Sequence, residues 1–330
     1  MTAVMDGPIL SVRDLRVDVQ VPMGTLHAVR GIDLELARGE TLCLVGESGC
    51  GKSLTALALM DLLPSKARRQ AAWLEFAGED LRHASRRRMS DLRGAGLAMI
   101  FQEPMTSLNP VLTIGAQLAA PFIRHGKGNR TAARKRAIEL LERVGVPGAE
   151  TRLGQYPHEL SGGLRQRVMI AMALMCQPAM IIADEPTTAL DVTIQAQLLK
   201  LLADLRRDLD LAILLITHDL GLVARFADRV SVMYAGEIVE HAATTDLFAR
   251  PAHPYTQALL QCLPTGGADS QLGTIAGVVP SLLLEPPGCA FQERCQHVIE
   301  ACARTAIPLS NLSKDHEAVH LNRCLLDFSA

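Results

Sequence analysis

The amino-acid sequence predicts an α/β fold with a small Cys-rich domain at its C-terminal end. Short apolar runs alternate with longer amphipathic stretches, which is typical of parallel strands joined by helical crossovers. A glycine-rich loop separates one apolar run from a helical stretch. Toward the C-terminus the pattern changes, because Pro and Gly become frequent and four cysteines lie close together. We therefore expect a main domain over residues 1–254 and an appended domain over residues 255–330.

Composition excludes several classes of protein. The chain has 330 residues, of which 48% are apolar, so it is long enough to bury a core. Its 33 Lys and Arg nearly balance 35 Asp and Glu, which argues against a broad basic surface for duplex nucleic acid. No apolar run approaches the roughly 20 residues that span a bilayer, and residues 1–8 lack the pattern of a signal peptide. We expect a cytoplasmic protein that reaches a membrane only by docking on another subunit.

The individual elements follow from apolar periodicity and from Pro and Gly punctuation. Strands are expected over residues 9–21, 26–36, 41–45, 97–101, 180–183 and 212–217. Helices are expected over residues 52–63, 131–144, 164–176 and 193–209. The segment 103–177 is mostly helical, so we expect it to form a helical subdomain.

The glycine-rich loop fits the phosphate-binding pattern G-x-x-x-x-G-K-[ST]. Its residues are Gly46, Glu47, Ser48, Gly49, Cys50, Gly51, Lys52 and Ser53. Glycines allow the backbone to wrap closely around phosphate oxygens, and the following helix directs its positive end at them. In such loops the Lys52 ammonium reaches the β- and γ-phosphates, and the Ser53 hydroxyl binds Mg²⁺. The loop predicts a nucleoside triphosphate as ligand.

Two carboxylates follow the apolar run at 180–183. A central strand would deliver Asp184 and Glu185 to the carboxyl edge of the sheet, where ligands of such sheets bind. Asp184 is a candidate ligand of Mg²⁺, directly or through water. Glu185 is the candidate group that polarises an attacking water. Together with the phosphate loop, this pair predicts a nucleotide-hydrolysing site.

The segment Leu160–Gln166, with the sequence LSGGLRQ, resembles the signature sequence of ABC-type ATPases. Ser161, Gly162 and Gly163 precede a predicted helix, so a hydroxyl, bare amides and a helix dipole are offered to an anion. The resemblance implies that this anion is the γ-phosphate bound by a second ATPase subunit, and that Gln166 belongs to the same site. It also implies a mixed sheet core with a β subdomain and a helical subdomain.

Other elements of this family are present in order. The resemblance implies that Gln102 senses Mg²⁺ and the attacking water, that Asp191 crosses to the partner subunit, and that His218 contacts the γ-phosphate. One departure concerns the base, because residues 17–29 contain no aromatic side chain on which adenine could stack. The candidates left to support adenine are Val19, Met23 and His27.

Residues 101–110, 183–197 and 253–256 are similar to the ATPases of the dipeptide/oligopeptide permease family, which includes nickel and glutathione importers. The similarity covers roughly residues 9–325 and is greatest to the dipeptide branch. It implies ATP hydrolysis coupled to uptake of di- or oligopeptides, with glutathione or nickel as alternative cargo. The implied partners are a similar but distinct ATPase subunit, two membrane permease subunits and an extracytoplasmic binding protein, at the cytoplasmic face of the inner membrane.

Other classes of protein contain the same kind of nucleotide-binding domain and are alternatives to a transporter subunit. A DNA-repair or chromosome ATPase would need a long coiled-coil insertion, for which the segment 103–177 is too short. Translation factors of this kind carry two nucleotide-binding domains in one chain, whereas only one phosphate loop is present here. A non-catalytic regulatory subunit would not need the intact set of Lys52, Asp184 and Glu185. We therefore expect no nucleic-acid partner.

Cys289, Cys295, Cys302 and Cys324 are separated by five, six and 21 residues. Four thiolates in a loop-rich segment suit a 4Fe–4S cluster or structural Zn²⁺, and a metal would compensate for the small core. The spacing lacks a close C-x-x-C pair, so an ordinary zinc ribbon fits less well. Unmetallated thiols are the third alternative. The resemblance to the permease ATPases favours the 4Fe–4S cluster.

Overall fold

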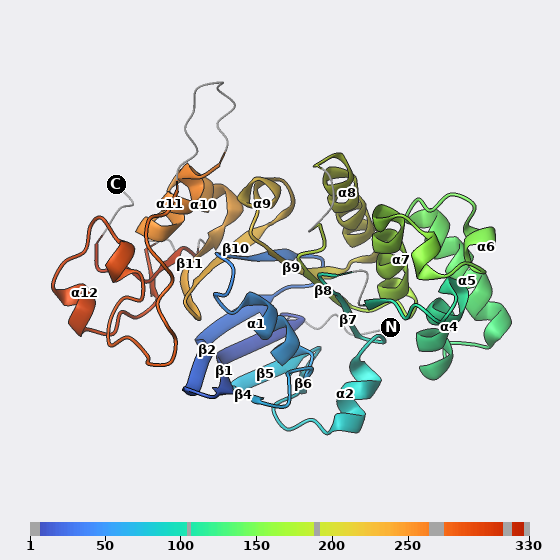
Figure 1. The fold of residues 1–330 in the computed structure, drawn as a ribbon, viewed down its shortest axis with the longest axis horizontal. Coiled ribbons are helices and arrows are strands. Elements are labelled where there is room, and N and C mark those ends of the chain that lie inside the picture. The colour runs from blue at the N-terminus through green and yellow to red at the C-terminus, as the bar shows by residue number, and fades with distance from the viewer. Residues whose placement is uncertain (1–6, 104–106, 188–191, 264–273, 313–318, 327–330) are drawn as a thin grey trace. The chain divides into compact units, whose positions relative to one another are not determined.

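The computed structural model describes residues 7–103, 107–187, 192–263, 274–312 and 319–326 (Figure 1). The chain forms two compact units. Unit 1 consists of Met1–Leu36, Thr41–Arg82 and Ile216–Ala330. Unit 2 consists of Ala37–Glu40 and His83–Leu215.

The first sheet of unit 1 is antiparallel and is built around β1 (Leu10–Val21). β1 pairs with β2 (Gly24–Leu36), β4 (Ala67–Gln70) and β5 (Trp73–Phe76), and β5 pairs with β6 (Glu79–Asp80). Buried side chains alternate along β1 until Asp14, which has a φ of 48° and shifts the register with β2. The two long strands confirm the expected alternation over residues 9–21 and 26–36.

The second sheet of unit 1 contains the strand that leads into the phosphate loop. β3 (Thr41–Val45) is fully buried and runs parallel to β10 (Arg229–Tyr234). A short turn joins β10 to β11 (Glu237–Ala243), and the two strands pair antiparallel. Beside β11 lie β13 (Leu321–Asn322) and then β12 (Ser310–Asn311), both antiparallel. The C-terminal residues thus extend this sheet, and a separate Cys-rich domain is not shown.

Helices of unit 1 are short. They are α1 (Lys52–Leu59), α9 (Leu220–Phe226), α10 (Thr244–Ala249), α11 (Pro254–Gln261) and α12 (Ala301–Arg304), with a 3₁₀ turn at Gln292–Arg294. α1 ends earlier than its apolar pattern predicts, because Asp61 adopts a φ of 52°, which a helix does not tolerate. β10 and β11 were not among the strands expected from the sequence.

Unit 2 contains β7 (Leu97–Ile100), β8 (Met180–Asp184) and the first four residues of β9 (Ala212–Thr217), which are neighbours in the sheet. β7 and β8 are parallel, with Ile100 opposite Ala183. Every residue of β8 is buried. These strands confirm the expectations for residues 97–101, 180–183 and 212–217.

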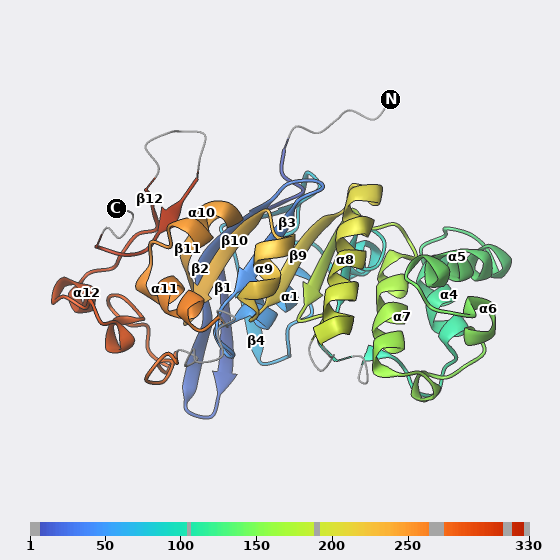
Figure 2. The ribbon, with the colours of Figure 1, turned by 90° about the horizontal axis from the view of Figure 1, so that it is seen from above.

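The helices of unit 2 are α2 (Arg86–Leu92), α4 (Ile114–Arg124), α5 (Arg130–Arg143), α6 (Ala149–Arg152), α7 (Gly162–Leu174) and α8 (Val192–Leu209). A 3₁₀ turn at Pro157–Glu159 precedes α7. α4, α5, α6 and α7 gather into one group (Figure 2). Thr113 and Asn129 cap α4 and α5 by accepting hydrogen bonds from backbone N–H groups of the first turn. The helices expected over residues 131–144, 164–176 and 193–209 are confirmed.

Among the described residues, every helix is too short or too polar to serve as a membrane span.

Candidate functional site

The phosphate loop of unit 1 has a backbone that only glycine can adopt at two positions. Gly46 has a φ of 154°, and a Cβ there would lie 2.1 Å from the Met233 carbonyl oxygen. Gly51 has a φ of 109°, and a Cβ there would lie 2.4 Å from the Ala28 carbonyl oxygen. Both separations are far inside van der Waals contact. The glycines of the motif are therefore required by close packing of the loop against β10 and β2, as well as by its turns.

Lys52 begins α1 and bends back into this loop. Its Nζ donates hydrogen bonds to the carbonyl oxygens of Gly46, at 2.8 Å, and Glu47, at 2.9 Å. The side chain is buried, so its charge is poorly screened by water. A buried ammonium in a glycine-shaped turn at the start of a helix is the arrangement that binds phosphate oxygens.

Cys50 occupies a variable position of the motif and is fully buried. Burial raises the pKa of its thiol, although the neighbouring Lys52 ammonium acts in the opposite direction. A thiol that stays protonated is a poor nucleophile. Cys50 instead contributes contacts within the site: its Sγ accepts a hydrogen bond of 3.7 Å from Lys52 Nζ, and its carbonyl accepts one of 3.0 Å from the Gly236 N–H.

The carboxyl edge of β7 and β8 in unit 2 brings together two of the expected side chains. Nε2 of Gln102 donates a hydrogen bond of 2.9 Å to Oε2 of Glu185. The parallel register of the strands explains this contact, because both residues follow their strands at the same edge. Asp184 is buried at the end of β8, whereas Glu185 has a φ of 44°. Strained backbone of this kind gathers at functional sites.

The signature segment forms the N-terminus of α7. Oγ of Ser161 accepts a hydrogen bond of 3.4 Å from the Leu164 N–H, so Ser161 is the N-cap, as expected. Ser161 and Gly162 are exposed. A Cβ at Gly162 would meet nothing within 4 Å, so the start of the helix is open. Gln166 differs, because its side chain is 1% exposed and its Nε2 has no hydrogen-bond partner among the described residues.

The remaining expected residues lie in different places. His218 is exposed directly after β9, and the neighbouring Asp219 caps α9 through bonds from two backbone N–H groups. Asp191 lies outside the described residues. On the β1–β2 hairpin, Met23 is exposed, while Nδ1 of His27 lies 2.7 Å from an Asp18 carboxylate oxygen. Support of adenine by this hairpin stays a prediction.

The four C-terminal cysteines are all free thiols. Burial raises the pKa of Cys289 to about 11, and the thiols of Cys302, Cys295 and Cys324 contribute in the same direction. Cys289 and Cys302 are also joined by a backbone hydrogen bond of 2.7 Å. Within the part of the chain that the structure describes, however, no group of three or more His, Cys, Asp or Glu is arranged to hold a metal ion. The expected metal site is therefore not shown.

Two residues that the sequence analysis missed hold the phosphate loop from the C-terminal region. The Glu47 N–H donates a hydrogen bond of 2.9 Å to Oη of Tyr255. The Glu47 carboxylate forms an ion pair with Arg294. Tyr255 lies in the segment 253–256 that is similar to the permease ATPases, but no local pattern predicts that it or Arg294 contacts the loop, since each lies more than 200 positions from Glu47 in the chain.

Comparison with known proteins identifies the family of this chain. A family model described as ABC transporter matches residues 29–188, and one described as oligopeptide/dipeptide transporter, C-terminal region, matches residues 239–302. Among solved structures, the ATP-binding cassette MJ0796 in a dimeric post-hydrolysis state bound to ADP and Pi is 26% identical, with a TM-score of 0.63. That match covers 71% of this chain and 98% of the cassette. The chain belongs to the ATP-binding proteins of ABC transporters, and it is an ABC-type ATPase.

More similar relatives have names that refer to peptide transport. A dipeptide transport ATP-binding protein of Bacillus subtilis (strain 168) is 48% identical, over 94% of this chain and 93% of that protein. An oligopeptide transport ATP-binding protein of the same organism is 47% identical, over 93% of this chain and 87% of its own length. A dipeptide transport ATP-binding protein of Escherichia coli (strain K12) is 47% identical, over 93% of this chain and 94% of that protein. The resemblance to the peptide permease ATPases is thus confirmed.

Proposed function

We propose that this chain is the ATP-hydrolysing subunit of an importer for di- or oligopeptides. The observation that carries the proposal is the extent of the likeness to the Bacillus subtilis dipeptide transport protein, which covers 94% of this chain. A likeness of this length takes in the phosphate loop, the signature segment and the C-terminal region together. Glutathione and nickel are the alternative cargoes, and a DNA-repair ATPase is the alternative class.

In the proposed reaction the phosphate loop binds the triphosphate of ATP. Lys52 contacts the β- and γ-phosphates, and the loop N–H groups bind the remaining oxygens. Oxygen donors suited to Mg²⁺ are present in Ser53, Gln102 and the buried carboxylate of Asp184. When bound, Mg²⁺ would neutralise charge on the phosphates. Glu185 then orients the attacking water and accepts its proton, while Gln102 holds the Glu185 carboxylate in place.

The second half of the proposed site would come from another ATPase subunit. The open N-terminus of α7, with Ser161, Gly162 and Gly163, would bind the γ-phosphate held by that subunit. Asp191 would cross to the partner subunit, and His218 would contact the γ-phosphate. ATP would join the two subunits because the closed pair has ligands for the γ-phosphate that the open pair lacks.

A cavity in unit 2 is the proposed docking surface for a membrane permease subunit. It has a volume of about 980 Å³ and lies among α4, α5 and α6. Its lining includes the apolar side chains of Ala119 and Ile123. Of the charged lining residues, Arg134 pairs with Glu150 at 2.7 Å, so Arg124 and Arg130 leave the lining with an excess of positive charge. An amphipathic cytoplasmic helix with acidic side chains fits this chemistry. Docking of this kind would hold the chain at the cytoplasmic face of the inner membrane.

We also propose a 4Fe–4S cluster on Cys289, Cys295, Cys302 and Cys324, with Zn²⁺ as the alternative. Support comes from the mutual influence of the four thiols on their pKa values and from their loop-rich surroundings. The described arrangement does not hold a metal, so binding would require the thiols to draw together. Iron and sulfide in protein purified without oxygen would support the cluster. Zinc without iron and sulfide would support the alternative, and neither metal would contradict both.

Capture of the tagged full chain from detergent-solubilised membranes tests the transport proposal. We expect two permease subunits and a second ATPase to be captured with it. Vesicles reconstituted with this complex, with the extracytoplasmic binding protein added outside, should take up a labelled dipeptide only with ATP and Mg²⁺ inside. Unlabelled glutathione or Ni²⁺ should compete only if they are cargo. Capture of nucleic acid or ribosomes without permease subunits would contradict the proposal.

A further inference from the structure

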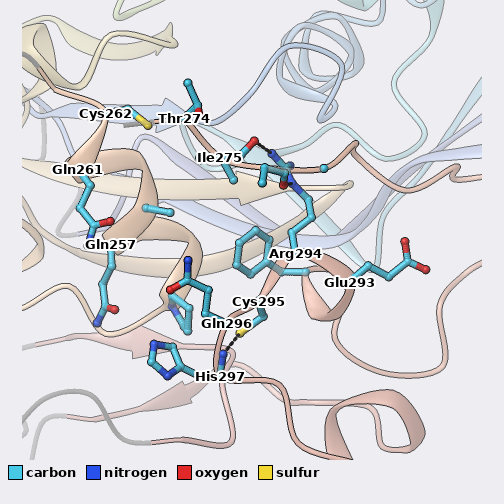
Figure 3. A pocket seen from close by; sticks show the side chains of 15 residues that line it. Gln257, Gln261, Cys262, Thr274, Ile275, Glu293, Arg294, Cys295, Gln296 and His297 are labelled. Atoms are coloured by element: carbon cyan, nitrogen blue, oxygen red, sulfur yellow. Dashed lines mark hydrogen bonds between the residues drawn. The ribbon is translucent and has the colours of Figure 1, made fainter. Parts of the chain in front are cut away.

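Arg294 is a buried arginine with every donor in use. It belongs to the 3₁₀ turn Gln292–Arg294, and its side chain is 3% exposed. Nε donates to the Ala276 carbonyl oxygen at 2.9 Å, and Nη2 donates to the Ile275 carbonyl oxygen at 3.1 Å (Figure 3). Nη1 also reaches Oη of Tyr234 at 3.3 Å. The two remaining bonds go to one carboxylate, so the five N–H groups of the guanidinium all have acceptors.

That carboxylate belongs to Glu47, the second residue of the phosphate loop. Nη1 of Arg294 lies 2.6 Å from Oε2 of Glu47, and Nη2 lies 3.0 Å from Oε1. Such a two-point pair fixes direction as well as distance. Lys52 meanwhile donates to the backbone carbonyl of Glu47, at 2.9 Å. Glu47 is therefore held by Arg294 through its side chain and by the phosphate-binding lysine through its backbone.

An aromatic cluster keeps the guanidinium in position. Its carbon lies 5.7 Å from the centre of the Tyr234 ring and 5.9 Å from that of Phe291. Tyr255 packs against both rings, at 4.6 Å and 5.3 Å between centres. All three rings are buried and shield the guanidinium from water, whereas the side chain of Glu47 is 28% exposed. The surroundings thus favour a lasting interaction between Arg294 and the loop.

We propose that Arg294 is a positioning residue for ATP binding, which neutralises Glu47 and keeps its carboxylate turned away from the phosphates. The proposal rests on the assignment of the loop as the ATP site. ATP brings several negative charges to a loop that itself contains a carboxylate, and like charges at short range repel each other. Pairing with Arg294 removes this repulsion. The C-terminal region thereby acts on nucleotide affinity without contributing a residue to the loop.

The alternative is that the ion pair has only a structural role and stabilises the loop by linking it to the C-terminal region. The two roles predict opposite signs for one variant. Both roles predict weaker ATP binding for Arg294→Gln. Neutralisation predicts it because Glu47 becomes an uncompensated carboxylate, and the structural role predicts it because the link to the loop is lost. Glu47→Gln leaves an uncompensated cation near the phosphates, so neutralisation predicts tighter ATP binding. The structural role predicts weaker ATP binding, because the ion pair that holds the loop is lost.

The experiment is titration of the purified full chain with a fluorescent ATP analogue in the presence of Mg²⁺. For Arg294→Gln we expect a Kd about 10-fold higher than that of the unmodified chain, and for Glu47→Gln a Kd about 3-fold lower. Arg304→Gln is the matched control, since Arg304 belongs to the same region but is exposed and, among the residues that the structure describes, pairs with the exposed Glu300 alone. Its Kd should not change. Thermal melting without nucleotide reports on folding of each variant.

Arg294→Gln with unchanged affinity, or Glu47→Gln with weakened affinity, would overturn the inference. If Arg294→Gln does not fold, the sign of the Glu47→Gln effect decides by itself. Lys52→Ala separates this inference from the assignment of the site. Unchanged ATP binding by Lys52→Ala would refute the assigned ATP site, and the inference with it. Loss of binding by Lys52→Ala together with unchanged affinity of Arg294→Gln would refute only the role of Arg294.

Discussion

Gln102 and Glu185 lie 83 positions apart in the chain, and the amide of Gln102 donates a hydrogen bond of 2.9 Å to the Glu185 carboxylate. Two parallel strands, β7 and β8, end at the same edge and so bring these side chains together. One carboxylate oxygen of Glu185 is thereby oriented by a neutral donor that leaves its charge intact. A base held in this way is suited to act on a water molecule.

Replacement of Glu185 by Gln should slow ATP hydrolysis by about 10²–10⁴-fold, because the general base is removed. ATP affinity should be kept, since the phosphate loop in unit 1 is untouched. Phosphate release by the assembled transporter and the Kd for ATP measure the two effects. Glu139→Gln, on the exposed face of α5, is the control and should leave both unchanged. ATP hydrolysis by Glu185→Gln at the normal rate would show that Glu185 is not the general base.

Replacement of Gly46 by Ala should destabilise the phosphate loop. The new Cβ would lie 2.1 Å from the Met233 carbonyl oxygen, so β10 or the loop must move. We expect a loss of about 1–3 kcal/mol in the free energy of unfolding, together with loss of ATP binding. Denaturant unfolding and nucleotide titration check this. Gly126→Ala is the control for positive φ alone, since a Cβ there meets nothing within 4 Å, and its cost should be smaller.

His253 should make the protein less stable in mild acid. Burial lowers its pKa from 6.5 to about 4, despite the opposing effect of Glu240. Between these two values the unfolded chain binds a proton that the folded chain does not, so stability falls as pH drops from about 6.5 toward 4. The contribution lost by pH 4 is about 3 kcal/mol.

His253→Asn separates this titration from the capping role of the side chain. Nδ1 of His253 accepts a hydrogen bond of 3.1 Å from the Tyr255 N–H at the start of α11, and an Asn oxygen can do the same without titrating. Unfolding measured from pH 7.5 to 4.5 should show a shallower decline for the variant. An equal decline in both proteins would mean that other groups cause the acid sensitivity.

Replacement of Ala120 by Arg should prevent docking of the permease subunit. Ala120 lines the cavity among α4, α5 and α6, so a long cation there would fill it and add to its positive charge. Capture of permease subunits by the tagged chain should fall by about 10-fold or more. Ala132→Arg, at an exposed position of α5 outside the cavity lining, should capture them normally. Normal capture by Ala120→Arg would place the docking surface elsewhere.

Local sequence was sufficient for the features that depend on neighbouring residues. The spacing of glycines before Lys52 specifies a phosphate loop, and Ser161 before an apolar helix specifies an N-cap, because these conformations involve only a few consecutive residues. The buried runs at β8 and β9 identified central strands for the same reason. The class of protein could be predicted because such segments occur in a fixed order along the chain.

Only the tertiary structure decided which distant residues meet. The pair of Arg294 with Glu47 spans 247 positions, and the burial of Gln166 and the addition of β12 and β13 to the sheet of β11 also have no local signature. Contacts of this kind depend on strand register and on the packing of whole elements, which periodicity within one segment does not encode. The residues that hold the phosphate loop from the C-terminal region therefore became visible only in the folded chain.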